Sequence, residues 1–120
     1  MSASPDYLDH LIDLLEPLGP VTIRRMFGGA GLYHDGLMFA LVAEDRLYLK
    51  ADDGNREAFE AEGLEPFTYE SRGKRAVMSY YEPPADALED GDILCQWARG
   101  AFEAALRTRA KTGRKRRVKG

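Results

Sequence analysis

The stretch GLYHDGLMFALVAEDRLYLK, residues 31–50, decides the fold of this chain, because it reads as three strands joined by two tight turns. Asp35-Gly36 is a strong signal for a two-residue hairpin, and Glu44-Asp45 marks a second turn. The strand between these turns, residues 37–43, is almost wholly apolar, which indicates a central strand. The stretch therefore predicts an antiparallel meander.

The residues before the meander predict a helix and a strand. Ser4-Pro5-Asp6 combines a serine N-cap, a proline at the first helical position and an acid in the first turn. Pro17 and Gly19-Pro20 end this helix. Residues 21–27 then read as a strand, which the glycines of residues 28–31 interrupt either as a bulge or as a tight turn with positive φ.

The residues after the meander predict a short helix, two strands and a long helix. The short helix covers about residues 54–62, with Asp52 or Asp53 as its cap, and the last helix runs from Asp90 to about Ala110. The order α-β-β-β-α-β-β-α contains no repeated β-α-β unit. We therefore expect an α+β domain with an antiparallel sheet of about five strands and flanking helices.

Charge divides the chain into an acidic body and a basic tail. Residues 1–106 hold all 20 acids and 9 of the 17 Lys and Arg, a balance of −11. Residues 107–120 hold the other 8 basic residues and no acid. We expect residues 1–110 to form one domain and residues 111–120 to form a disordered basic tail.

Composition also predicts the compartment. One cysteine allows no internal disulfide, and the N-terminus has neither the basic nor the apolar region of a signal peptide. Apolar stretches are far shorter than the ~20 residues that a membrane span needs. We expect a cytoplasmic protein without a membrane partner.

Six blocks of the sequence resemble one protein family, the N-terminal domain of the TfoX/Sxy competence regulators. The likeness covers about residues 7–108, with the blocks in order and at similar gaps. The blocks are RRMFGG (24–29), GLY (31–33), DGLMFALV (35–42), LYLK (47–50), PFTY (66–69) and MSYYE (78–82).

The resemblance implies a secretion-chaperone-like fold and a regulatory role. Long members of the family promote transcription of DNA-uptake genes together with the cyclic-AMP receptor protein, and they carry a second, helical domain. This sequence stops where that domain would begin, so we expect a stand-alone form, of a kind common in bacteria. The family has no agreed catalytic residues, so the resemblance implies none here.

Two features near the first strand are candidates for binding an anion or a partner. Arg24 and Arg25 precede the glycine-rich segment that contains Gly28 and Gly29, and two cations beside such a loop can hold an anion. The alternative is a purely structural turn or bulge, because these glycines lie between strands and not before a helix.

The remaining reactive side chains predict no catalytic site, metal site or cofactor. His10 and His34 have no spacing that brings them together, and Cys95 lies among apolar residues of the last helix, as a packing residue does. No Ser-His-Asp or Cys-His arrangement can be assembled. We expect that the chain is not an enzyme.

An aromatic set on the last two strands has two interpretations. Phe67, Tyr69, Tyr80 and Tyr81 either pack in the core and across strands or form a partner surface. The first interpretation is preferred, since acids flank the strands and the cations cluster in the connecting turn.

These observations predict a non-catalytic regulatory or adaptor domain that acts through protein contacts, as a monomer or a homodimer. The alternative is a weak nucleic-acid binder that uses the basic end of the chain through electrostatic contact with phosphates. Its candidate contacts are Arg107, Arg109, Lys111, Arg114, Lys115, Arg116, Arg117 and Lys119.

Overall fold

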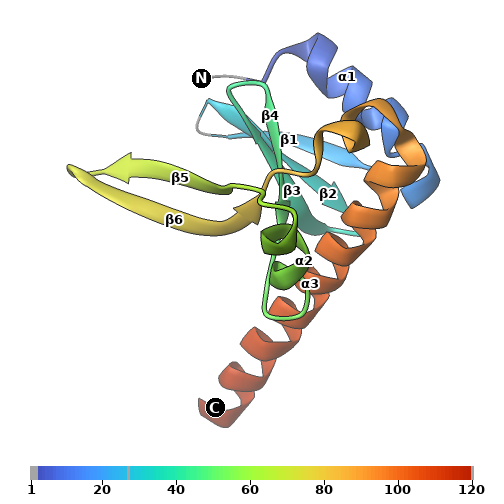
Figure 1. The fold of residues 1–120 in the computed structure, drawn as a ribbon. Coiled ribbons are helices and arrows are strands. Elements are labelled where there is room, and N and C mark those ends of the chain that lie inside the picture. Colours follow the sequence, from blue (N-terminus) through green and yellow to red (C-terminus); the bar gives the residue numbers. More distant parts are fainter. Residues whose placement is uncertain (1–2, 27, 120) are drawn as a thin grey trace.

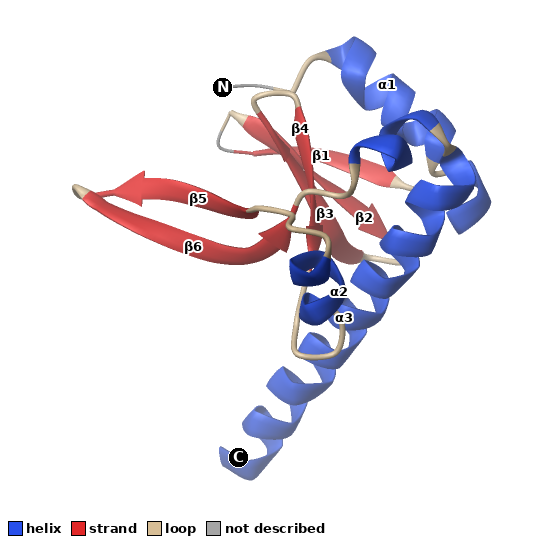
Figure 2. Ribbon diagram, in the orientation of Figure 1, coloured by secondary structure: helices blue, strands red, loops and turns tan. Residues whose placement is uncertain are grey.

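The fold is an antiparallel sheet with helices against one side of its main part (Figures 1 and 2). The computed structural model describes residues 3–26 and 28–119, with side chains except those of Ser71 and residues 112–119. The elements in chain order are α1 (Pro5–Leu14), η1 (Glu16–Leu18), β1 (Thr22–Met26), β2 (Gly29–His34), β3 (Leu37–Ala43), β4 (Arg46–Lys50), α2 (Arg56–Ala61), β5 (Pro66–Ser71), β6 (Lys74–Tyr81), η2 (Ala85–Glu89) and α3 (Gly91–Lys119).

The predicted α+β class and antiparallel sheet are confirmed, with six strands in place of about five. The strand order is β1-β2-β3-β4-β6-β5. The glycine segment makes a turn and not a bulge, since Gly28 has φ +79° and Met26 pairs with Gly29. β1 and β2 are therefore two separate, paired strands.

The helix starts follow local capping chemistry. The Ser4 hydroxyl accepts a hydrogen bond from the Tyr7 amide at 3.3 Å, and an Asp90 carboxylate oxygen accepts from the Asp92 amide at 2.9 Å, as the sequence predicts. The predicted cap of α2 is wrong, because Asn55 stands at the cap position without a side-chain cap. Asp52 is engaged elsewhere, as described below.

The last helix continues beyond the predicted end. We expected it to end near Ala110, whereas α3 is helical to Lys119. The side chains of residues 112–120 lie outside the described residues, so the division of the chain at residue 111 stays a prediction. No described helix is long and apolar enough to cross a lipid bilayer.

The core lies between the sheet and the helices α1 and α3. The sheet contributes large side chains, such as Leu32, Phe39 and Leu49, and all three are fully buried. α3 contributes mostly small ones. Those with at most 5% exposure on α3 are Leu94, Cys95, Ala98, Ala101, Ala104 and Ala105. Large sheet residues thus fill the space that the alanines of the helix leave open.

Two glycines test this packing in opposite directions. A Cβ on Gly29 would collide with the carbonyl oxygen of Val42 on the neighbouring strand, whereas a Cβ on Gly100 would meet only the Asn55 side chain at 3.9 Å. We expect Gly29→Ala to lower the free energy of unfolding by about 1–3 kcal/mol through overpacking. The matched variant Gly100→Ala, inside α3, should raise it by about 1 kcal/mol because alanine favours helix. Urea unfolding followed by circular dichroism measures both, and an unchanged midpoint for Gly29→Ala would contradict the described contact.

Candidate functional site

The candidate site is the two-stranded ribbon formed by β5 and β6, which projects away from the helices (Figure 1). β6 has eight residues, but only its last two pair in register with β4, as Leu49 with Tyr81 and Lys50 with Tyr80. One further hydrogen bond, from the Ala51 amide to the Ser79 carbonyl at 2.8 Å, extends the seam. Beyond this seam the ribbon, residues 66–81, has only its own two strands.

The projecting part of the ribbon exposes apolar and basic side chains. Tyr69 is 44% exposed, Val77 66% and Met78 36%, and Leu106 on α3 is the other large apolar side chain described as exposed. Tyr69 lies opposite Ala76, and Thr68 lies opposite Val77. Strand alternation therefore places Tyr69 and Met78 on one face of the ribbon and Val77 on the other. The cations Arg72, Lys74 and Arg75, all exposed, surround the turn at its tip.

Aromatic contacts fasten the root of the ribbon. Tyr81 stacks on Phe59 of α2 with ring centroids 5.2 Å apart, and Phe67 meets Tyr48 edge-on at 4.9 Å. The Lys50 ammonium lies 5.1 Å from the centre of the Tyr80 ring. Burial raises the pKa of the Tyr48, Tyr80 and Tyr81 hydroxyls, with a further contribution for Tyr81 from its hydrogen bond to Glu60. Phe67, Tyr80 and Tyr81 thus pack at the root, as the interpretation as packing residues predicts. Of the four aromatic residues, only Tyr69 is exposed.

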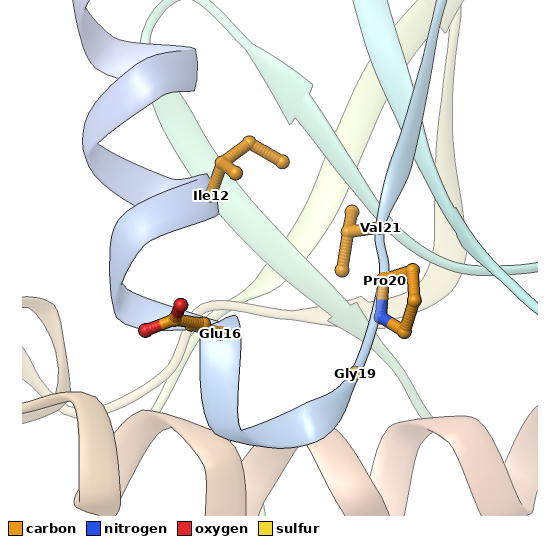
Figure 3. Close-up of a pocket in the computed structure, with 5 residues that line it drawn as sticks. All are labelled: Ile12, Glu16, Gly19, Pro20 and Val21. Atoms are coloured by element: carbon orange, nitrogen blue, oxygen red, sulfur yellow. The ribbon is translucent and has the colours of Figure 1, made fainter.

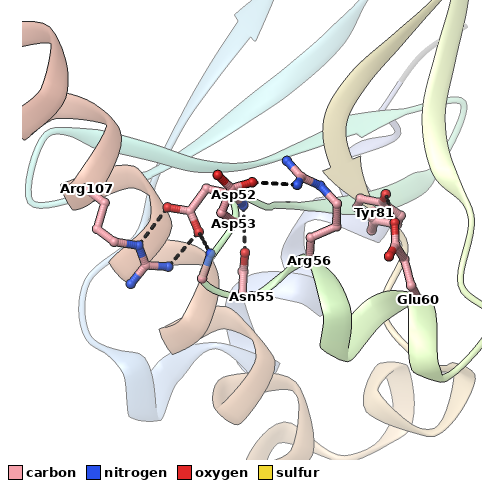
Figure 4. A network of polar contacts seen from close by, with 8 residues as sticks. Asp52, Asp53, Asn55, Arg56, Glu60, Tyr81 and Arg107 are labelled. Atoms are coloured by element: carbon pink, nitrogen blue, oxygen red, sulfur yellow. Dashed lines mark hydrogen bonds and ion pairs between the residues drawn. The ribbon is translucent and has the colours of Figure 1, made fainter.

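A polar network holds α3 against the loop between β4 and α2 (Figure 4). The Arg107 guanidinium donates to both carboxylate oxygens of Asp52, at 2.6 and 2.7 Å, and the Gly54 amide donates to the same carboxylate at 2.8 Å. The Asp52 amide donates to the Asn55 side chain at 2.7 Å. The two bonds from Arg107 join residues 55 positions apart and set where the loop, and with it α2, lies.

The network predicts a pH-dependent stability. The hydrogen bond from Arg107, followed by that from Gly54, lowers the pKa of the Asp52 carboxyl from its ordinary 3.8 to about 2. Stabilisation is therefore present above pH 3.8 and is lost as the pH falls towards about 2. We expect Asp52→Asn to lower the free energy of unfolding by about 1 kcal/mol at neutral pH, given partial solvent screening, and by almost nothing near pH 2.

The matched control for this prediction is Asp53→Asn. Asp53 pairs with Arg56 at 2.7 Å, but its side chain is 85% exposed, so its loss should change the free energy of unfolding by less than about 0.5 kcal/mol. Urea unfolding at several pH values measures both variants. An effect of Asp52→Asn that stays constant between neutral and acidic pH would contradict the assignment.

The arginine and glycine residues of the predicted anion site do not converge. The Arg24 guanidinium lies 5.2 Å from the centre of the Tyr33 ring, while Arg25 donates to the Ala3 carbonyl at 2.5 Å. As neighbours in β1 they extend to opposite faces of the sheet. Gly28 supplies the positive φ of the turn, and Gly29 allows the close approach to β3. Both glycines therefore have structural reasons to be there, and anion binding stays a prediction.

The two histidines and the cysteine each contact a different backbone carbonyl. His10 contacts the Leu88 carbonyl at 3.0 Å, and His34 contacts the Pro20 carbonyl at 2.7 Å and packs edge-on against Phe102. Cys95 is buried, and its thiol, whose pKa burial raises, donates to the Leu14 carbonyl. In the described part of the chain, no three His, Cys, Asp or Glu side chains come close enough to hold a metal ion.

One open pocket lies beside the loop between η1 and β1 (Figure 3). Its volume is about 310 Å³, and Ile12, Gly19, Pro20 and Val21 line it together with Glu16. Figure 3 shows the Glu16 carboxylate directed away from Pro20 and Val21. The pocket therefore has apolar walls without converging polar groups, which gives it no catalytic chemistry.

The predicted nucleic-acid contacts divide into three groups. Arg107 is held by Asp52, whereas Arg109 and Lys111 are exposed on the part of α3 that projects beyond the sheet (Figure 1). Arg114, Lys115, Arg116, Arg117 and Lys119 have side chains outside the described residues. The sequence offered no signal that Arg107 pairs with Asp52, because only the fold brings the two together.

The described residues form an α+β domain around a six-stranded antiparallel sheet, from which the β5–β6 ribbon projects. Comparison with known proteins gives the family. The model of the TfoX N-terminal domain matches residues 13–105, so the chain belongs to the TfoX N-terminal domain family, as the sequence resemblance indicates.

Three curated relatives match part of this chain. The chain is 32% identical over 98 residues to the DNA transformation protein TfoX of Haemophilus influenzae, covering 80% of this chain and 45% of the relative. It is 31% identical over 74 residues to the DNA transformation protein TfoX1 of Aliivibrio fischeri, covering 62% and 35%. It is 24% identical over 107 residues to Protein Sxy of Escherichia coli, covering 89% and 51%. The chain thus spans about half or less of the length of these relatives.

Proposed function

We propose that this chain is a non-catalytic regulatory domain that contacts a protein partner through the β5–β6 ribbon. The observation that carries the proposal is the exposure of Tyr69, Val77 and Met78 on a ribbon that projects from an otherwise well-packed domain. Exposed apolar side chains that gather on one element mark interaction sites more often than they serve folding. Tyrosine, methionine and arginine are also the residue types enriched in protein interfaces.

The names of the relatives suggest the regulated process. Two of them are DNA transformation proteins, and the family resemblance implies transcriptional control of DNA-uptake genes. We propose the same process here, with this domain supplying a protein contact and no chemistry of its own. The groups that usually carry chemistry support this view, since the histidines and the cysteine each have a separate structural partner.

Photo-cross-linking tests the ribbon contact. A photoreactive residue at Ala76, which lies opposite Tyr69 on the face shared with Met78, should yield a discrete protein adduct in cells of the source organism, and the same residue at the exposed Asp13 of α1 should not. Adding Tyr69→Ser and Met78→Ser should abolish the Ala76 adduct while changing the free energy of unfolding by less than about 1 kcal/mol, because both side chains are exposed and lie outside the buried core. An adduct that survives both serines, or that forms equally from Asp13, would count against the proposal. Transcript levels of DNA-uptake genes, measured in the same cells, test whether the regulated process is DNA uptake.

Nucleic-acid binding by the basic end of the chain is the second candidate. It is favoured by the exposure of Arg109 and Lys111 on α3 and by the 8 basic residues without an acid after residue 106. Deleting residues 111–120 should abolish binding to a DNA duplex and flatten its salt dependence, since each neutralised phosphate adds about one unit to the slope. Arg107→Gln removes one charge that Asp52 already neutralises, so it should leave binding almost unchanged. An unaltered affinity after the deletion, measured by fluorescence anisotropy, would eliminate this candidate.

A further inference from the structure

β5 is the outermost strand of the sheet next to β6, so one of its two edges faces solvent. An exposed edge carries backbone N–H and C=O groups that another extended chain can pair with. Proteins that do not use such an edge usually block it with charges, bulges or proline. Here Pro66 and a register irregularity between Pro66 and Thr68 are confined to the start of the strand, and the residues from Thr68 to Glu70 that follow are regularly paired and exposed.

The turn at the tip determines which backbone groups of β5 point outward. Arg72 and Gly73 have φ of +54° and +78°, as a type I′ turn requires, and Ser71 pairs with Lys74 across it. The closing pair of such a hairpin exchanges its backbone hydrogen bonds, and bonded and non-bonded pairs then alternate along the ladder. Tyr69 therefore bonds to β6, while Glu70 and Thr68, opposite Arg75 and Val77, direct their N–H and C=O groups to the solvent edge.

Side chains beside this edge define the chemistry of what would pair with it. The ribbon carries three cations, Arg72, Lys74 and Arg75, against the single acid Glu70, whereas residues 1–106 as a whole have a balance of −11. Phe67 and Tyr69 stack at 6.1 Å between ring centroids and lie on the same ribbon face as Met78. The edge thus combines an apolar face with a cationic end.

We infer that β5 accepts an added antiparallel or parallel strand from a partner protein: an extended segment that alternates apolar residues with acids. Its backbone pairs with Thr68 and Glu70, and its apolar side chains pack beside Tyr69 and Met78. Its acids lie on the other face near the ribbon tip, where Arg75 lies opposite Glu70 and balances the charge of that acid. This inference rests on the proposed function and adds to it the mode of binding and the chemistry of the partner.

Two other occupants fit these observations less well. Nucleic acid would contact the three cations at the tip of the ribbon but would leave Val77 and Met78 uncovered. Beyond those three cations, the ribbon has no other positive charge to bind phosphate. A second copy of the chain would bring the same three cations and only Glu70 on its own β5, so its charge does not complement the edge. Charge complementarity favours an acidic protein segment.

Nuclear magnetic resonance on the full chain tests strand addition with a defined probe. The probe is a capped peptide of seven residues that alternates valine and glutamate. Its addition should shift the amide signals of Thr68 and Glu70 and slow their hydrogen exchange. The Tyr69 and Ser71 amides, which already face β6, should keep their exchange rates. A peptide with lysine in place of glutamate should bind about tenfold more weakly or not at all.

Thr68→Pro is the discriminating variant, because it removes an outward N–H without removing a bond to β6. It should weaken binding of the valine–glutamate peptide about tenfold or more, while Thr68→Val, which keeps the N–H, should leave the affinity within about twofold. If Thr68→Pro disturbs the Tyr69 and Ala76 signals, the same test is made on the unchanged protein with a probe N-methylated at alternate residues, which should not bind.

Several outcomes would overturn the inference: equal binding of the lysine peptide, unchanged binding by a folded Thr68→Pro variant, or shifts confined to residues outside the ribbon. The inference would also be overturned if a DNA oligonucleotide reproduced the shifts of the Thr68 and Glu70 amide signals. A shift of these signals with protein concentration in the absence of peptide would overturn it too. An Ala76 cross-link in cells that survives Thr68→Pro would leave the proposed function standing and exclude only the strand-addition inference.

Discussion

The contact between the alanine-lined face of α3 and the sheet is the constraint on which the rest of the structure depends. Ala98, Ala101 and Ala104 are fully buried, so this part of the helix lies flat on the sheet over about two turns. Large side chains on that face would clash with Phe39 and Leu49, which occupy the space between the layers. The start of α3 is equally close, since a Cβ on Gly91 would stand 2.8 Å from the Leu14 carbonyl oxygen at the end of α1.

Because α3 is fixed on the sheet, it can position elements that lie far from it in the sequence. Its Arg107 holds the loop between β4 and α2 through Asp52, and that loop places Phe59 of α2 under Tyr81. Tyr81 in turn lies at the seam where β6 meets β4. The root of the ribbon is thus tied to the core through aromatic and charged contacts, while its outer part has no such partners. A packed base with an exposed arm is the geometry that the proposed partner contact requires.

The distribution of charge also differs between the packed base and the ribbon. The helices α1 and α2 expose acids such as Asp9, Asp13 and Glu57, whereas the tip of the ribbon exposes three cations. If the ribbon contacts a partner as proposed, these opposite charges on separate surfaces would orient that partner and disfavour contact through the wrong side. Arg24 and Lys50 lie over tyrosine rings on β2 and β6, which occupies two further cations in structural contacts.

The sequence by itself determined the element order apart from one strand, the antiparallel turns and the starts of α1 and α3. Such features depend on residues within a few positions of one another: Asp35-Gly36 makes its turn, and Ser4 and Asp90 cap their helices, whatever the rest of the chain does. Only the tertiary structure decided that Gly28 makes a turn and not a bulge, that Asp52 binds Arg107 in place of capping α2, and that only the last residues of β6 pair with β4. Burial and ion pairing depend on which distant segments meet. The same apolar pattern of residues 76–81 would suit a covered strand or an exposed ribbon, so packing alone distinguishes them.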